Sequence, residues 1–350
     1  MGAEPSLAGV ALIPQSKYVH ELRAALPAEV FEPATSRLFL VPVYAAIAIT
    51  TCIAIAQAWL PWFLWPLASL VIGCSSACLT FIAHEALHGG ITRNKPLRYA
   101  VGCVGFLQYA VSPRLWITWH DRVHHSCANF DRDPDCYPTL AQYEGDALIR
   151  FATDMSLGGR RWRGVLTVIT GFTVQSTIQL VLARTLLEMP RRAHRIAIAE
   201  TVLGIAFWTV VATLVGFVPF LFIFVVPLLV ANTIIMSFIL TNHSLSPQVE
   251  VNDPLITGLS VTTSPWIERL TLGFGYHVEH HLFPAMSTRH APRVRDLVLA
   301  RWPERYQSMP LLRALGELHR TARVYKDSTT LFDPRTGAEF KTLLPRTAER

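Results

Sequence analysis

The sequence predicts an all-α integral membrane protein with four transmembrane helices in two hairpins, interfacial helices and a cytosolic helical cap. Hydrophobic residues make up 51% of the 350 residues and charged residues only 16%, which is too apolar for a soluble domain of this size. Residues 38–83 and 201–242 contain no Asp, Glu, Lys or Arg. As helix, each run would be roughly 60 to 70 Å long, about twice the ~30 Å hydrocarbon core. Each run is therefore expected to contain two spans.

Helix-breaking residues divide each charge-free run near its middle. The first run is interrupted at residues 59–62 (WLPW) and the second at residues 216–219 (GFVP). Proline cannot continue the helical hydrogen-bond ladder and glycine favours a turn, so both places are expected to be hairpin tips. The predicted transmembrane helices lie near residues 38–58, 63–84, 197–215 and 219–241.

Basic residues lie on one side of this predicted bundle. Neither hairpin tip contains Lys or Arg, whereas the opposite ends of the spans carry Arg37, Arg93 and the clusters at 160–163 and 191–195. Because cytoplasmic segments are enriched in Lys and Arg, both termini are expected to face the cytoplasm. This orientation, together with attraction to anionic lipid headgroups, accounts for the net charge of +6. No nucleic-acid partner is predicted.

Two further stretches, 100–119 and 164–189, are apolar but more interrupted. Pro113 and Arg114 break the first, and the second contains several uncharged polar residues and an arginine. If only one stretch crossed the bilayer, the ends of the second and fourth spans would lie on opposite sides of the membrane. Either both stretches cross the bilayer or neither does, and their interruptions favour interfacial or re-entrant helices for both.

Composition divides the chain into three parts. Residues 1–37 are expected to form a cytosolic N-terminal segment and residues 38–286 the membrane domain. Residues 287–350 are more polar and form the predicted cytosolic C-terminal cap. Within the cap, the sequence predicts amphipathic helices near 287–301 and 309–322 and extended chain over 329–344.

Nine histidines form four groups on the predicted cytoplasmic side, and two of the groups directly follow the charge-free runs. His84 and His88 are four residues apart, so on a helix they lie on one face and can bind one metal ion. This spacing recurs in two other groups, each with one histidine rotated by about 100° that can reach a second ion. Nine imidazoles are too many for one ion, which predicts a two-metal site. The recurring pairs are His120/His124 and His277/His281, the rotated neighbours are His125 and His280, and His243 stands alone.

Two other interpretations of the histidines are available. Residues 84–88 read His-Glu-Ala-Leu-His, which matches the zinc-protease pattern, but seven further histidines on the same predicted side argue against a protease. A metal transporter with histidine-rich cytoplasmic loops is the second alternative. A transporter is expected to carry polar ligands within its spans, and these spans are nearly free of them.

The order and spacing of the histidine groups resemble the boxes of the membrane fatty acid desaturase family. The three larger groups correspond to the three boxes in the family's order. Residues 275–284 (GYHVEHHLFP) are especially similar, and Asn129 with residues 133–135 (DPD) also resembles the family. The likeness covers residues 38–300. The second box has three residues between its first histidine and the pair, which only some family members share.

This resemblance implies a non-haem di-iron centre on a four-span helical fold whose cytosolic cap carries the metal site. The implied reaction is the O2-dependent introduction of a C=C bond into the acyl chain of a lipid or an acyl-CoA. Two electrons would come from a ferredoxin or a membrane cytochrome that docks on the basic cytoplasmic face. Di-iron hydroxylases and carotenoid ketolases share the histidine pattern and remain alternatives. The nine histidines are the implied metal ligands.

The resemblance also implies roles for residues close to the histidines. Asn242 would hold a metal-bound water. Histidine ligands usually donate their second ring N–H to an acceptor, and carboxylates near the boxes are available for this role. No catalytic residue beyond the metal centre is expected. The predicted supporting carboxylates are Asp121, Asp133, Asp135 and Glu279.

Overall fold

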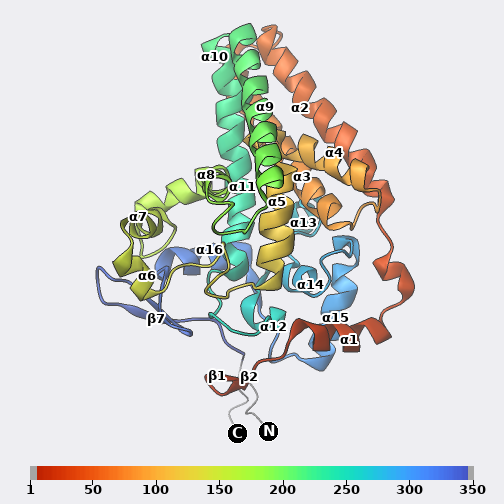
Figure 1. Cartoon of the computed structure of the whole chain (residues 1–350). Helices are drawn as coiled ribbons and strands as arrows, with labels where there is room; N and C mark the ends of the chain where they lie inside the picture. The colour runs from red at the N-terminus through yellow and green to blue at the C-terminus, as the bar shows by residue number, and fades with distance from the viewer. Residues whose placement is uncertain (1–5, 346–350) are drawn as a thin grey trace.

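The computed structural model describes residues 6–345 and is mostly helical, as the sequence predicts. Long helices lie side by side in a bundle whose far tip carries two hairpin turns (Figure 1). Within the described residues, five helical segments are long and apolar enough to cross a membrane. They contain α2 (Leu40–Ala56), α3 (Trp65–His88), α8 (Val165–Val181), α9 (Arg191–Val215) and α11 (Val226–His243).

Four of these segments match the predicted transmembrane helices, but their ends differ. α3 continues past the predicted end at residue 84 and stops before Gly89, whose φ of +99° favours glycine. α9 begins at Arg191, before the predicted start at residue 197, because a helix can extend beyond its apolar run. The last span starts as α10 (Phe217–Phe220) and a π-helical turn (Leu221–Val225), which lead directly into α11.

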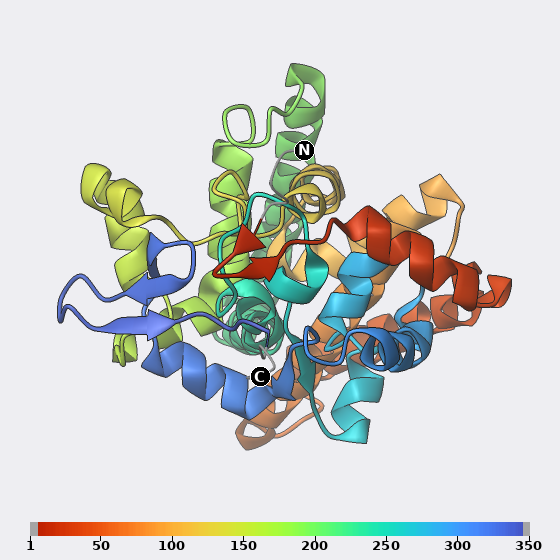
Figure 2. The ribbon, with the colours of Figure 1, turned by 90° about the horizontal axis from the view of Figure 1, so that it is seen from below.

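The fifth segment, α8, runs in a different direction from the other four. Figure 1 shows α8 end-on, beside α9 and α11, which are seen from the side. Figure 2, turned by 90°, shows the same helix lying across the bundle. This is the orientation expected of the interfacial helix predicted at 164–189. The other interrupted stretch contains most of α4 (Lys95–Phe106) and all of α5 (Pro113–Trp116).

α3 lies at the centre of the bundle, where it packs against α2, α4 and α11. Every residue from Ser75 to His88 is buried. Small residues allow the neighbouring backbones to approach closely, because a Cβ on Gly105 of α4 would lie only 2.4 Å from the Cβ of Ala83. Such close approach is typical of helix packing in membranes. The close packing of α4 against Ala83 therefore holds the end of α3 that carries His84 and His88.

Short helices and small sheets form the other end of the molecule, where the described chain begins and ends (Figure 1). The helices are α1 (Gln15–Ala25), α6 (Leu140–Gly145), α7 (Ala147–Met155), α12 (Pro254–Thr257), α13 (Pro265–Leu270), α14 (His277–Leu282), α15 (Ala291–Arg301) and α16 (Leu311–Arg320). The strands are β1 (Ser6–Leu7), β2 (Val10–Ala11), β3 (Ser260–Thr262), β4 (Ser308–Pro310), β5 (Val324–Asp327), β6 (Thr330–Phe332) and β7 (Glu339–Lys341).

Pairing among these strands ties distant parts of the chain together. β1 pairs with β2, and β5, β6 and β7 form a three-stranded sheet, both antiparallel. β3 and β4 pair in parallel and so join the chain before α14 to the chain after α15. The two predicted amphipathic helices occur as α15 and α16, and the predicted extended segment contains β6 and β7.

Candidate metal centre

The structure brings the nine histidines into one largely buried cluster. His84 and His88 lie in the last two turns of α3, and His243 is the last residue of α11. The histidines of the final box lie on α14, which is buried along its whole length. The second box lies on a π-helical segment (Ile117–Val123) and the 3-10 turn after it (His124–Ser126). Ring centroids of neighbouring histidines are 4.3 to 6.4 Å apart.

Within the cluster, eight ring nitrogens form two groups of four, which we call site A and site B. In each site the four nitrogens lie within 4.8 Å of one another, close enough to surround one metal ion. His125 lies between the sites. Its Nε2 is 3.3 Å from His120 Nε2 and 3.1 Å from His280 Nε2, while its ring stacks on that of His281. Site A consists of His84, His88, His120 and His280, and site B of His124, His243, His277 and His281.

The spacing predicts that His120 and His124 share one ion. The structure divides them between sites A and B, and it also places both beside Asp135 in a third, smaller group of possible ligands. The division between A and B follows from the local helix geometry. A π-helix has more residues per turn than an α-helix, and a tight 3-10 turn follows it, so the i, i+4 rule does not hold there. On the α-helical turn of α14, His277 and His281 do share site B and His280 turns to site A.

Hydrogen bonds at the edge of the cluster determine which ring nitrogen faces inward. His88 Nδ1 is 2.8 Å from Asp121 Oδ1, and His243 Nδ1 donates to the Thr257 carbonyl oxygen at 2.7 Å. With the proton on Nδ1, the Nε2 of each ring keeps a lone pair directed into the cluster. His88 Nε2 is buried and has no hydrogen-bond partner among the described residues. A buried lone pair of this kind fits a bound cation.

Two carboxylates support His124. Its Nδ1 is 3.0 Å from an oxygen of Asp133 and 3.5 Å from one of Asp135. Asp135 also accepts hydrogen bonds from Trp119 Nε1 and Gln175 Nε2, each at 2.7 Å. Burial lowers the pKa of His124, but the two carboxylates outweigh burial and raise this pKa to about 9. The surroundings of the ring therefore favour a positive charge, which a metal ion at Nε2 would supply.

The histidines of α14 are held in the neutral form. Burial lowers the pKa of His277, His280 and His281 well below the ordinary value, and neighbouring imidazoles lower it further. Neutral imidazole is the form that binds a metal ion. A set of buried, neutral imidazole nitrogens suits iron, zinc or copper and does not suit calcium or magnesium, which require oxygen ligands.

Of the predicted supporting residues, Glu279 lies differently from the prediction, whereas the position of Asn242 leaves its predicted role open. Glu279 is hydrogen-bonded to Ser260 Oγ at 2.8 Å and Tyr306 OH at 2.6 Å, and not to a histidine ring. It lies on α14 between His277 and His280, but the helix directs its carboxylate toward β3 and the chain after α15. Asn242 is buried beside His243, and its Oδ1 has no partner among the described residues. This oxygen remains available for a bound water.

The sequence did not indicate that the Thr257 carbonyl accepts the hydrogen bond from His243, because every residue has a backbone carbonyl and no residue type distinguishes this one. The four other histidines lie outside the two sites, as predicted. His20 and His319 are exposed, and His194 and His290 are partly exposed.

A helical bundle of membrane-type composition with two adjoining groups of four imidazoles is typical of histidine-rich membrane proteins that bind metal ions. Residues 34–312 match the model of the fatty acid desaturase family, and the chain belongs to this family. It is therefore an oxidoreductase, since the desaturases of this family oxidise their substrates.

Several curated desaturases are similar to the chain. It is 27% identical to dihydrorhizobitoxine desaturase of Bradyrhizobium elkanii over 263 residues, which cover 71% of each chain. It is 28% identical to an sn-1 acyl-lipid omega-3 desaturase (ferredoxin) of a Synechocystis species over 124 residues, 35% of this chain and 34% of the relative. The chloroplastic omega-6 fatty acid desaturase of Arabidopsis thaliana is 22% identical over 300 residues, 83% of this chain and 65% of the relative. The chain thus aligns with less than two thirds of the last two relatives.

Proposed function

We propose that this protein is an O2-dependent di-iron desaturase that introduces a C=C bond into the acyl chain of a membrane lipid. The observation that carries the proposal is the pair of adjoining imidazole sites, A and B, at one end of the helical bundle. Membership of the desaturase family supports iron as the metal. In the proposed orientation, both termini and both metal sites face the cytoplasm, because the basic clusters lie at that end of the spans.

Two irons would supply the strong oxidant that removes hydrogen from an unactivated methylene, which no side chain can do. The reaction takes one hydrogen from each of two neighbouring carbons, and O2 is reduced to two waters with two external electrons and two protons. The protein's own contribution is to orient the imidazole rings and to exclude water. Asp121 and Asp133 accept hydrogen bonds from Nδ1 of His88 and His124, and burial keeps bulk water away from the rings.

An apolar cavity supports a lipid acyl chain as the substrate. The cavity measures about 450 Å³, within the size range of ligand pockets. It lies between α8, α9 and the segment that leads into α11, and its lining contains no charged side chain. Leu115 lines the cavity, and the ring of the next residue, Trp116, packs against His84, His88 and His120. The cavity wall and the wall of site A therefore adjoin on helix α5.

The proposed electron donor is a ferredoxin or a membrane cytochrome. The name of the Synechocystis relative includes ferredoxin. Arg160 and Arg163 are exposed on this chain, whereas Arg161 is partly buried in an ion pair with Asp154. An acidic donor would be attracted to the exposed arginines, so they are the proposed docking contacts.

Mass spectrometry of intact lipids from a host that expresses the chain tests the proposed reaction. We expect membrane lipids that have lost two hydrogens per acyl chain, before any such change in the acyl-CoA pool. The product should be absent when the host expresses His280→Ala, and present with His319→Ala, which changes an exposed histidine outside the sites. A gain of one oxygen would identify a hydroxylase instead, and oxidised carotenoids a ketolase. Metal-dependent flux into vesicles without O2 consumption would identify a transporter.

A further inference from the structure

The chain directly after His243 is held by hydrogen bonds from distant residues. Helix α11 ends at His243, and residues 244–247 continue as buried chain without regular structure. The last carbonyls of a helix have no helical partner, and buried carbonyls need donors from elsewhere. Each of the five consecutive carbonyls of residues 243–247 accepts a hydrogen bond from a residue far away in the sequence.

Asn129 and residues 323–343, which we call the C-terminal segment, supply these donors. Asn129 Nδ2 donates to the carbonyl oxygens of His243 at 3.2 Å and of Pro247 at 3.0 Å. The C-terminal segment covers the three carbonyls between them. Its donors are Arg323 Nη1 to Ser244, the Leu343 amide to Leu245 at 2.8 Å, and Tyr325 OH to Ser246 at 2.7 Å.

Arg323 is buried although no carboxylate within residues 6–345 forms an ion pair with it. Its side chain also donates to the carbonyls of Leu157 and Leu318, each at 3.1 Å. A buried charge is costly unless its hydrogen-bonding groups are satisfied, and here backbone carbonyls satisfy it. Arg323 therefore joins three parts of the chain: the loop before α8, the end of α16 and the chain after His243.

We propose that Arg323 and Tyr325 are positioning residues for site B. By holding the backbone directly after His243, they keep its imidazole beside His281, whose Nε2 is 3.1 Å from His243 Nε2. Both residues lie beyond residue 312, where the match to the family model ends. The inference rests on the proposed di-iron function and assigns the C-terminal segment a role in it.

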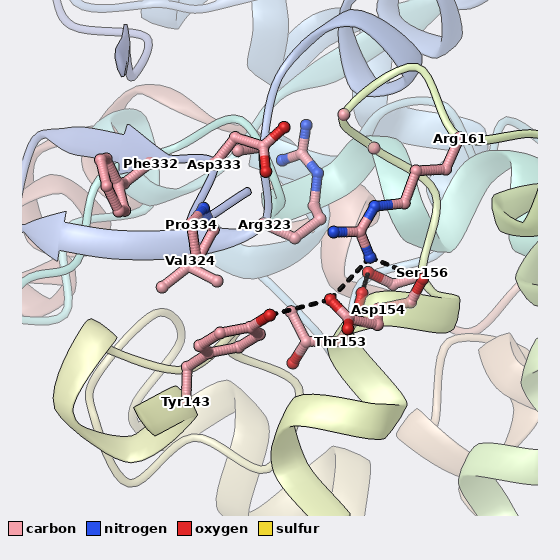
Figure 3. A pocket seen from close by; sticks show the side chains of 13 residues that line it. Tyr143, Thr153, Asp154, Ser156, Arg161, Arg323, Val324, Phe332, Asp333 and Pro334 are labelled. Atoms are coloured by element: carbon pink, nitrogen blue, oxygen red, sulfur yellow. Dashed lines mark hydrogen bonds and ion pairs between the residues drawn. The ribbon is translucent and has the colours of Figure 1, made fainter. Parts of the chain in front are cut away.

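Site A provides an internal control for this inference. Its two histidines on α3 are held by helix packing at the centre of the bundle. None of its four histidines is joined directly to the segment 244–247, as His243 of site B is. A second control is Tyr143, whose hydroxyl donates to Asp154 at 3.0 Å in the same part of the molecule. Figure 3 shows Tyr143 and Arg161 directed to Asp154 across a small pocket that Arg323 also lines. Tyr143→Phe removes a hydroxyl without touching residues 243–247.

The test measures iron release from the purified full-length protein into a chelator, with Mössbauer spectra of iron-57 to follow each iron separately. In Tyr325→Phe, and more strongly in the double variant Arg323→Lys with Tyr325→Phe, one of the two irons should leave about 10-fold faster. The other iron should leave at the wild-type rate. Tyr143→Phe should release both irons as the wild type does.

Release of both irons at wild-type rates in both variants, or equal acceleration of both irons, would overturn the inference. Tyr325→Phe removes a single oxygen, so it decides the question even if the double variant does not fold. Wild-type protein that binds no iron would instead contradict the proposed function, which separates the two failures.

Discussion

Replacing His277 by alanine is expected to abolish desaturation and to remove about half of the bound iron, because His277 is a proposed ligand of site B alone. The loss of activity should exceed the about 10- to 100-fold loss of metal affinity that follows a change in a supporting residue. His280→Ala should abolish activity equally by emptying site A. Iron content and product yield per protein, measured on both variants, check the expectation.

The matched control for these ligand variants is His319→Ala. His319 is exposed on α16 and lies outside both sites, so this variant should keep both irons and full activity. If His277→Ala or His280→Ala retained wild-type activity, the corresponding site would have no part in the reaction.

Changing Asp133 to asparagine is expected to lower the iron affinity of site B by about 10- to 100-fold. The Asp133 side chain is fully buried and accepts from His124 Nδ1 and from the backbone amides of Asn129 at 2.8 Å and Asp135 at 3.0 Å. An amide presents only one acceptor oxygen, so at least one of these donors would lose its partner, at a cost of about 1–3 kcal/mol. Titration of iron into the metal-free variant measures the change.

Asp131→Asn is the control for this charge removal. Asp131 is exposed and accepts one hydrogen bond, from Gln142 Nε2 at 3.0 Å. Its replacement removes the same charge close in sequence but leaves His124 untouched, so the affinity of both sites should stay at the wild-type value. An unchanged iron affinity in Asp133→Asn would show that His124 does not need this carboxylate.

The helical class and the hairpin positions were predictable because they depend on local chemistry. A run of more than forty residues without charge has few alternatives to paired membrane helices, and the prolines and glycine mark the turns. The direction of α8 was predictable less directly. Its sequence is apolar enough to span a membrane, so the expectation depended on the polar residues that interrupt 164–189 and on keeping the ends of the second and fourth spans on one side. In the structure, packing against α11 and its neighbours places α8 across the bundle.

The candidate site was predictable where its histidines lie on α-helix. The spacing of His277, His280 and His281 correctly divided them between two sites, since 3.6 residues per turn applies to α14. The spacing could not indicate that His120 and His124 also belong to separate sites, because no residue type in 117–126 distinguishes a π-helical turn from an α-helical one. Backbone acceptors such as the Thr257 carbonyl, and contacts made by a distant C-terminal segment, depend on tertiary structure alone.

The central claim is that two separate irons occupy sites A and B. Metal analysis of purified wild-type protein, combined with its Mössbauer spectrum, tests it most directly. We expect two irons per chain in two distinct signals of equal area, of which His277→Ala loses one and His280→Ala the other. One metal ion per chain, or zinc in place of iron, would contradict the account.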